Sequence, residues 1–273
     1  MKILSFSIFG SRQTTKENFW LFAHYMRGLY WNTRMAKLLY PDYLVSVSVD
    51  SGTFSDYDNI FYGLKEHYGI AFSIYEMMPL CKMMLLRLSP IFWDNADTVV
   101  SRDADAILTM RERKCVQEFV NSGMTVHAIT DDPMHGTGLM GGMTAFRAKP
   151  IREKYGTWEN MLSKSPVAIN GHGTDQQFMN AVLYPEYKNQ MFCHYLNGEK
   201  GNGEAIVKNE IANVVLDGVN PKLYESNLCC RHIGSAGVVE LETRRFFFRH
   251  DKENGFEEIA KRYPRVFYWY ANE

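Results

Sequence analysis

The pattern of apolar and polar positions divides the first half of the chain into alternating strands and helices. Leu44 to Asp50 alternates apolar and polar residues, which is typical of a half-buried strand. From Thr14 to about Leu39, apolar side chains recur three and four positions apart, which predicts a long helix. The same patterns predict strands at 2–9, 44–50, 70–75, 97–102 and 125–130, and helices at 14–39, 55–68, 80–90 and 111–122. This alternation predicts a mostly parallel sheet flanked by helices.

After residue 130 the pattern becomes less regular. The predicted elements are an apolar segment with several glycines at 138–148, helices at 150–162 and 174–183, and an amphipathic helical tail after residue 240. Thr174 is the expected N-cap of its helix. Residues 197–204 carry three glycines and no apolar anchor, so we expect a mobile surface loop and a candidate lid. No repeat or linker-like stretch occurs, which favours one domain with an elaborated second half.

The composition is that of an ordinary folded protein. Hydrophobic residues make up 46% and charged residues 22% of the 273 positions, which excludes an intrinsically disordered chain. The formal net charge is −1, so no overall basic field indicates nucleic acid or a membrane surface as partner. The net charge does not exclude a local basic patch. The 16 Tyr and 17 Phe residues suit ring stacking and sugar contacts, and they equally suit a large core.

The cysteines and the termini indicate a cytoplasmic location. Five cysteines without a secretory signal are expected to be free thiols in a reducing compartment. Cys229, Cys230 and His232 lack the further ligands that a structural zinc site needs. The apolar start of the chain is too short for a signal peptide and fits a first strand better. No apolar run approaches the roughly 20 residues of a membrane span, so no transmembrane segment is expected.

Two carboxylates follow the strand predicted at 97–102. Side chains of a strand alternate between its faces, so Asp103 and Asp105 are expected on one side, with Ala104 on the other. Ligands of open α/β sheets bind beyond the carboxyl ends of the strands. Mg²⁺ or Mn²⁺ is commonly held by one or two carboxylates together with substrate phosphates. The triplet therefore predicts half of a metal site, and the alternative is a solvated turn after a strand.

Several short motifs occur in an order that resembles a known family. They are the first strand ending at Gly10, Tyr40-Pro41, an Arg in the helix before the Asp-x-Asp triplet, Arg102-Asp103-Ala104-Asp105, Gly141-Gly142-Met143 and Gly173-Thr174-Asp175-Gln176. Together they resemble GT-A-type, nucleotide-sugar-dependent glycosyltransferases, in particular a family with the Asp-x-Asp motif found in bacteria, phages and large viruses. The resemblance covers roughly residues 1 to 185. It implies a Rossmann-type α/β domain in which 1–130 bind the nucleotide sugar and 131–273 form the acceptor side and the C-terminal elaboration.

The resemblance also implies a donor site. Asp103 and Asp105 would hold Mn²⁺ or Mg²⁺ against the diphosphate of a nucleoside-diphosphate sugar. The residues expected to line the nucleoside pocket are Ser5, Phe6, Ser7 and Phe9. Asp50 would accept a hydrogen bond from the ribose or the base. Arg87 would pair with the carboxylates or touch the donor phosphate, and its alternative is a surface cation beside a Leu-rich helix.

Further roles are implied for residues after position 140. Gly141 and Gly142 would let the backbone approach a bound sugar, or they mark a tight turn. Asp175 and Gln176 would contact the donor sugar, with Asp175 as the base of an inverting enzyme or as a hydroxyl acceptor in a retaining one. The alternative for Asp175 is an acid at a helix start. His232 would complete the metal coordination. His194, followed by Tyr195 where relatives often have His-Asp, departs from the family pattern, which puts a role for it in doubt.

The function predicted from these residues is transfer of a sugar from a nucleoside-diphosphate donor, with UDP favoured, to an acceptor hydroxyl. The acceptor is a glycan, a protein, a lipid carrier or a hydroxylated base in phage DNA. The DNA hypothesis requires a basic groove built from Lys149, Arg152, Lys154, Arg244, Arg245 and Arg249. Two alternatives remain: a nucleotide-sugar-binding pseudoenzyme, and a two-metal phosphoesterase or nuclease that would also use Asp131 and Asp132.

Overall fold

The fold is seen in a computed structural model that describes residues 1–130, 138–166, 173–195, 213–215 and 241–268. The strands are β1 (Lys2–Ile8), β2 (Tyr43–Asp50), β3 (Ala71–Tyr75), β4 (Thr98–Arg102), β5 (Val126–Thr130), β6 (Met143–Arg147), β7 (Met191–Tyr195) and β8 (Asn213–Val215). The helices are α1 (Phe19–Leu39), α2 (Ser51–Tyr68), α3 (Leu80–Leu85), α4 (Met110–Ser122), α5 (Ala148–Tyr155), α6 (Trp158–Leu162), α7 (Thr174–Phe178), α8 (Tyr184–Tyr187), α10 (Leu241–Asn254) and α11 (Phe256–Lys261).

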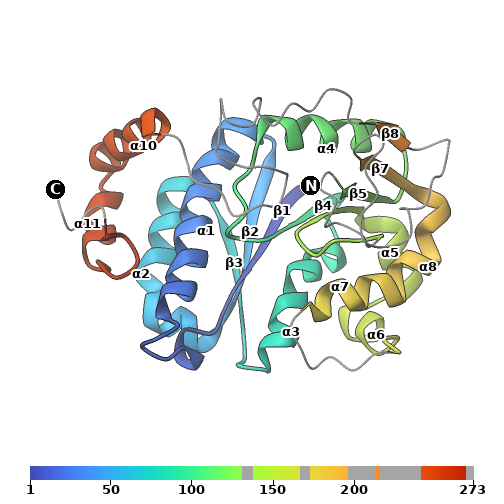
Figure 1. The fold of residues 1–273 in the computed structure, drawn as a ribbon, viewed down its shortest axis with the longest axis horizontal. Helices are drawn as coiled ribbons and strands as arrows, with labels where there is room; N and C mark the ends of the chain where they lie inside the picture. The colour runs from blue at the N-terminus through green and yellow to red at the C-terminus, as the bar shows by residue number, and fades with distance from the viewer. Residues whose placement is uncertain (131–137, 167–172, 196–212, 216–240, 269–273) are drawn as a thin grey trace.

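The described strands form one sheet in the order β3-β2-β1-β4-β6-β5-β7-β8 (Figure 1). All neighbours are parallel except β6, which runs antiparallel to β4 and β5. The predicted fold class, a single α/β domain with a mostly parallel sheet flanked by helices, is confirmed. The sheet continues from the first half of the chain into the second.

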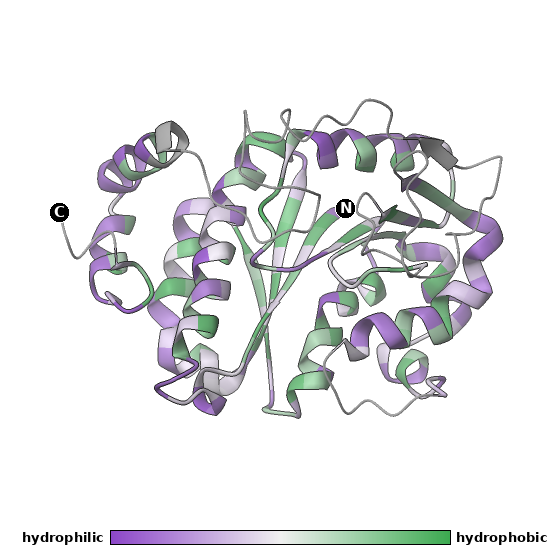
Figure 2. Ribbon diagram, viewed as in Figure 1, coloured by the Kyte–Doolittle hydropathy of each residue, from purple (hydrophilic) through white to green (hydrophobic). Residues whose placement is uncertain are grey.

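Apolar side chains cover both faces of the sheet. Leu4 and Val100 belong to a core shared with α1, α2, α4 and the C-terminal helices. Ile3 and Val99, one position earlier on the same strands, belong to a second core with α3, α5, α6 and α7. The central strands are largely hydrophobic, whereas hydrophilic residues are frequent on the flanking helices (Figure 2). This is the three-layer arrangement that fully buried parallel strands require. Among the described residues, no helix is both long and apolar enough to cross a membrane.

The order of the strands creates a crevice at one position. The chain runs from β1 through α1 to β2 and through α2 to β3, and then returns to place β4 on the other side of β1. α1 and α2 pack on one face of the sheet, and α3 packs on the other. The direction of winding therefore reverses between β1 and β4. Open α/β sheets bind ligands at such a point, beyond the carboxyl ends of the strands.

Several boundaries differ from the sequence-based predictions. β4 ends at Arg102, as predicted, but the strand conformation does not extend further, because Asp103 begins a turn closed by a 3.3 Å hydrogen bond from Ala106 N to the Asp103 carbonyl. The premise that Asp103 and Asp105 share one side of a strand is therefore wrong. Thr174 is the first residue of α7 and not its cap, because Gly173 takes the cap position at φ 72°. The helix predicted to reach residue 183 changes to a π-helical turn after Phe178.

Other helices are shorter than predicted. α1 begins at Phe19 and not near Thr14, and α3 passes into a 3₁₀ segment, Leu86–Phe92, that includes Pro90. The helix predicted at 150–162 is divided into α5 and α6 at Gly156, whose φ is 73°. The loop at 197–204 lies outside the described residues.

Candidate functional site

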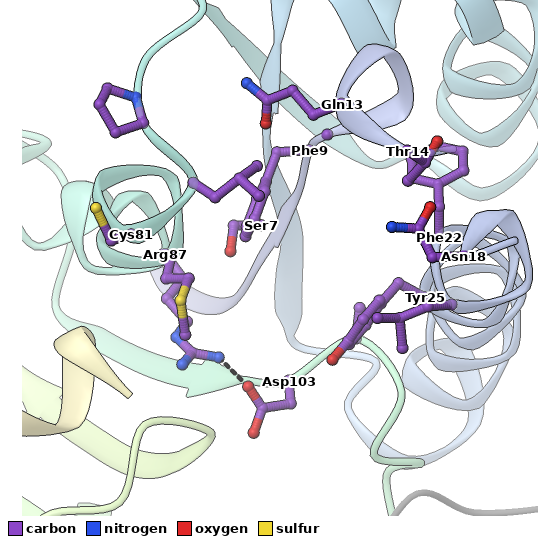
Figure 3. Close-up of a pocket in the computed structure, with 16 residues that line it drawn as sticks. Ser7, Phe9, Gln13, Thr14, Asn18, Phe22, Tyr25, Cys81, Arg87 and Asp103 are labelled. Carbon is purple, nitrogen blue, oxygen red and sulfur yellow. Dashed lines mark hydrogen bonds and ion pairs between the residues drawn. The ribbon is translucent and has the colours of Figure 1, made fainter. Parts of the chain in front are cut away.

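A cavity of about 620 Å³ opens at the crevice between β1 and β4 (Figure 3). One wall comes from the end of β1, the following turn and α1, and the other comes from α3 and the segment after it. The lining residues are Ser7, Phe9, Gly10, Gln13, Thr14, Asn18, Leu21, Phe22, Tyr25, Pro79, Leu80, Cys81, Met84, Arg87, Asp103 and Ala104. Most of this surface is apolar, with Arg87 and Asp103 as its charged groups. A mostly apolar cavity with a few polar groups is the usual form of a small-molecule site.

Arg87 connects two carboxylates at one side of this cavity. Its side chain is only 6% exposed, and its two terminal nitrogens pair with Asp103 and Asp175. Asp175, in the first turn of α7, is 4% exposed, whereas Asp103 is 40% exposed. The alternative in which Arg87 is a surface cation is wrong, because its guanidinium is buried between acids from two different elements.

Asp105 belongs to the same turn after β4, but it is not among the residues that line the cavity. Its side chain is 22% exposed, and one carboxylate oxygen lies 3.9 Å from His24 Nε2 on α1. Burial raises the pKa of Asp105, and the negative charge of Asp103 raises it further. A cation bound between the two carboxylates would offset both effects. The chemistry of this pair therefore fits a hard divalent ion such as Mn²⁺ or Mg²⁺.

Gly141 and Gly142 bring a backbone loop against these charged groups. Because β6 is antiparallel to β4, the start of β6 lies beside the end of β4, and Met143 pairs with Arg102. A Cβ atom at Gly142 would collide with the Asp103 carboxylate, and one at Gly141 would collide with the Asp175 carboxylate and the Arg87 guanidinium. The glycine pair is therefore required by close approach to protein side chains.

A buried ion pair between β4 and α4 supports the same region. Arg102 is fully buried, and its Nε lies 3.1 Å from Glu112 Oε1 on α4. Its terminal nitrogens donate to the carbonyls of Gly142, at 2.5 Å, and Ala106, at 3.4 Å. One guanidinium thus ties the glycine loop to the turn that carries the acidic residues.

The predicted nucleoside-pocket residues fall into two groups. Ser7 and Phe9 line the cavity, whereas Ser5 and Phe6 are fully buried within the sheet and do not line it. Period-two alternation explains part of this difference, because Phe6 faces the α1 side of the sheet and packs in its core. The Asp50 carboxylate accepts hydrogen bonds from Gly10 N and Thr53 N, both at 2.9 Å. In this structure Asp50 caps α2 and fixes the turn after β1.

The remaining predicted residues are either not among the cavity lining or lie outside the described residues. Gln176 is next to Asp175 in α7, half-buried, and its carbonyl accepts a hydrogen bond from Asn180 at 2.8 Å. His232 lies outside the described residues, as do Asp131, Asp132, Cys229 and Cys230. His194 is buried beside α4, bonded to His127 at 2.9 Å and to Glu118 at 2.8 Å, and it does not line the cavity.

Tyr25, Gln13 and Asn18 are among the cavity residues that the sequence analysis did not assign to a site. Tyr25 was assigned to the apolar face of a helix, but its side chain lines the cavity on the side of Asp103 (Figure 3). Burial and the charges of Asp105 and Asp103 raise the pKa of Tyr25 to about 12, so its hydroxyl keeps its proton at neutral pH. Gln13 and Asn18 add carboxamides to the cavity lining. Both precede α1, and Asn18 had been included in the predicted helix 14–39.

The basic groove required by the DNA hypothesis does not form from the described residues. α5 carries Lys149, Arg152 and Lys154, and it lies at the opposite end of the molecule from α10, which carries Arg244, Arg245 and Arg249 (Figure 1). Arg152 is also occupied, since it donates to backbone carbonyls such as Ile91 O at 3.0 Å and Trp93 O at 2.8 Å.

Comparison with known proteins gives weak structural likeness only. No protein-family model and no curated protein match the sequence. A structure from Bacillus anthracis, described as a glucose-1-phosphate thymidylyltransferase in complex with sucrose, shows 13% identity and a TM-score of 0.46, covering 72% of this chain and 87% of its own. Residues 1–349 of TarS from S. aureus show 12% identity and a TM-score of 0.43, covering 73% of this chain. This chain spans 59% of that TarS fragment.

A third solved structure is 4-diphosphocytidyl-2C-methyl-D-erythritol synthase from Anaerococcus prevotii, with 10% identity and a TM-score of 0.46, covering 77% of this chain and 94% of its own. Likenesses of this strength establish neither a family nor a substrate for this chain.

Proposed function

We propose that this protein is a Mn²⁺- or Mg²⁺-dependent glycosyltransferase that moves a sugar from a nucleoside-diphosphate donor, with UDP favoured, to an acceptor hydroxyl. The observation that carries the proposal is the cavity at the β1–β4 crevice, which brings Asp103 and Arg87 to one side of a pocket of nucleotide size. The motif order that resembles GT-A-type glycosyltransferases supports it independently.

The cavity offers different chemistry along its length. Phe9, Phe22 and Tyr25 supply aromatic surface against which a base or ribose would pack, and every base has a face that stacks on such rings. Gln13 and Asn18 supply carboxamides for the edge of the base. The Asn18 Oδ1 accepts from Thr15 N at 2.6 Å, which leaves its amide nitrogen as the group offered to a ligand.

The charge near Asp103 supports the proposed cation. Asp103, Asp105 and Asp175 carry three negative charges when ionised, and Arg87 carries one positive charge. A net charge of −2 would repel a diphosphate. A divalent ion held by Asp103 and Asp105 would supply Lewis-acid stabilisation of the departing nucleoside diphosphate. Further ligands would come from donor phosphates, because no group of three or more His, Cys, Asp or Glu side chains in the described residues could hold an ion.

This chain's own residues would orient the donor around that charge. Arg87 would keep Asp103 and Asp175 apart and in place, and it lies close enough to the cavity to contact a phosphate. The Tyr25 hydroxyl would donate a hydrogen bond to a phosphate or sugar oxygen. Asp175 and Gln176 would contact the donor sugar from α7. Inverting and retaining routes share these requirements, so the stereochemistry and the acceptor, a glycan, protein, lipid or modified DNA base, stay open predictions.

The experiment is thermal unfolding with a panel of nucleoside diphosphates and nucleotide sugars, with and without Mn²⁺. A ligand that binds only the folded state raises its stability, by roughly 2.7 kcal/mol at a hundred times its dissociation constant. We expect a metal-dependent rise for one base, absent in Asp105→Ala and retained in Asp42→Ala, an exposed acid paired with Lys2 and Arg113. No rise with any nucleotide would overturn the proposal.

Product analysis separates the two nucleotide-binding hypotheses. A glycosyltransferase releases nucleoside diphosphate from the bound donor when an acceptor is present, whereas a pseudoenzyme binds the donor and releases nothing. Chromatography of the nucleotide after incubation with Mn²⁺ and a panel of acceptors distinguishes them. Donor binding without release under any of these conditions would favour the pseudoenzyme.

A further inference from the structure

The turn that carries Asp103 and Asp105 lies directly against α1. Gly28 faces it so closely that a Cβ atom there would collide with the Ala104 carbonyl oxygen and approach Asp105 Cα to 2.8 Å. Tyr25, Gly28 and Asn32 are spaced three and four positions apart, so they lie on one face of α1. This face forms a cradle for residues 103–108, and we refer to it as the α1 cradle.

Asn32 is fully buried in the α1 cradle, and its carboxamide is fully used by the turn. Its Nδ2 donates to the carbonyls of Ala104, at 2.8 Å, and Ala106, at 3.1 Å. Its Oδ1 accepts from Leu108 N at 2.9 Å. The partners fix the orientation of the amide group, because two carbonyls require a donor and one N–H requires an acceptor.

The carbonyls that accept these hydrogen bonds lie next to the acidic residues in the chain. Ala104 stands between Asp103 and Asp105, and its carbonyl belongs to the peptide group that joins Ala104 to Asp105. β4 has already ended at Arg102, and sheet hydrogen bonds no longer hold the chain there. The Asn32 side chain supports the turn instead, because it holds the carbonyls of the residues on both sides of Asp105 and, through Ala104, the backbone that follows Asp103.

We propose that Asn32 is a positioning residue that aligns Asp103 and Asp105 for a divalent cation. The inference rests on the proposed function, because it assigns those carboxylates to a metal. Groups that orient metal ligands without touching the ion commonly change metal affinity by 10- to 100-fold when removed. The residue was not singled out from the sequence, since a lone Asn inside an amphipathic helix carries no signal of its partners.

The test compares Asn32→Ala with Asn254→Ala. Asn254 is a matched control, because its carboxamide also bonds to other parts of the chain, accepting from Phe256 N at 2.9 Å and donating to Tyr68 Oη at 3.1 Å, but it lies in α10, away from the cavity. Mn²⁺ binding is measured by electron paramagnetic resonance with and without UDP, and backbone order is measured by amide hydrogen exchange of residues 104–108. Asn32→Ser, which keeps one short hydroxyl, is the second variant if Asn32→Ala does not fold.

We expect Asn32→Ala to weaken Mn²⁺ binding at least tenfold and to speed exchange in residues 104–108, with Asn32→Ser intermediate and Asn254→Ala like wild type. Binding of uridine alone, which needs no metal, should change less than twofold in every variant. Equal Mn²⁺ affinity in wild type and the Asn32 variants would overturn the positioning role while leaving the proposed function intact. Absence of Mn²⁺ and nucleotide binding in wild type would overturn both.

Discussion

At the scale of single residues, Arg87 compensates the negative charges of two carboxylates beside the cavity. Its guanidinium is buried between Asp103 and Asp175, and Asp175 is itself 4% exposed. Removing one partner from a buried ion pair leaves a charge without compensation, which typically destabilises a protein by 3–5 kcal/mol. Since Asp103 is 40% exposed and screened by water, we expect Arg87→Gln to lower the free energy of unfolding by about 3 kcal/mol in urea denaturation.

Arg12→Gln provides the comparison for that prediction. Arg12 pairs with Asp56 at 3.0 Å, but both side chains are well exposed, at 49% and 35%. Exposed pairs contribute little to stability because water screens them, so this variant should unfold nearly as wild type does. A loss of similar size in both variants would show that the buried pairing of Arg87 has no special weight.

At the scale of elements, a buried histidine from β5 and one from β7 form a hydrogen-bonded pair beside α4. His127 Nε2 lies 2.9 Å from His194 Nδ1, and His194 Nε2 lies 2.8 Å from Glu118 Oε2. Burial lowers the pKa of His127 well below its ordinary value of 6.5, and His194 adds to this. Burial also lowers the pKa of His194, against the opposing effect of Glu118. Both imidazoles are therefore neutral in the folded protein at pH values where the unfolded chain already binds protons.

The two lowered pKa values predict that the folded protein loses stability as the pH falls. The stabilisation is complete above about pH 6.5 and is lost as the pH falls towards the folded-state pKa values. The slope is about 1.4 kcal/mol per pH unit for each imidazole protonated only in the unfolded state. We expect urea denaturation at pH 7.5, 6.5 and 5.5 to show this fall in wild type and a shallower fall in His127→Phe, which can still pack on Phe119. His67→Gln, at a site remote from this pair, should keep the wild-type slope.

The C-terminal helices depend on another buried group. Asp251 on α10 is fully buried, accepts hydrogen bonds from Tyr30 and Tyr68, and pairs with Arg34 at 2.7 Å. Asp251→Asn removes the charge that compensates Arg34, so we expect a loss of about 3–5 kcal/mol in urea denaturation and faster tryptic cleavage within α10. Glu253→Gln, an exposed change on the same helix, should have neither effect. Unchanged cleavage in Asp251→Asn would show that the aromatic contacts of α10 and α11 suffice to hold it.

The sequence predicted the elements of the first half better than their ends. Strong periodicity placed the five strands of the first half and four helices, because burial on one or both faces leaves a clear pattern. The end of β4 was predicted correctly at residue 102, but strand alternation was wrongly extended to Asp103 and Asp105, because a turn held by the distant residue Asn32 has no local signature. Asp50 was assigned to the ligand for a similar reason, since an acid after a strand fits a helix cap and a binding site equally well.

At the scale of the whole molecule, the motifs indicated that Arg87 faces the Asp-x-Asp carboxylates, but not that Asp175 and the glycine pair meet it there. Arg87, Asp103 and Asp175 were all selected from the order of motifs, and the structure brings them into one ion-pair cluster. The glycine pair was expected to make room for a ligand, whereas its closest neighbours are these side chains. Such contacts depend on β6 running antiparallel beside β4, and strand order across a sheet is not encoded in local periodicity.

The inserted strand β6 also fixes the order in which the protein can be completed during translation. β5 leaves the ribosome before β6 and β7, the two strands that flank it, have been made. At roughly 5–20 residues per second, the interval from residue 130 to residue 195 lasts about 3–13 s. Through that time β5 presents an apolar strand with open edges, the kind of surface that chaperones cover and that other nascent chains can pair with. The strand arrangement that shapes the cavity thus delays closure of the sheet until late in synthesis.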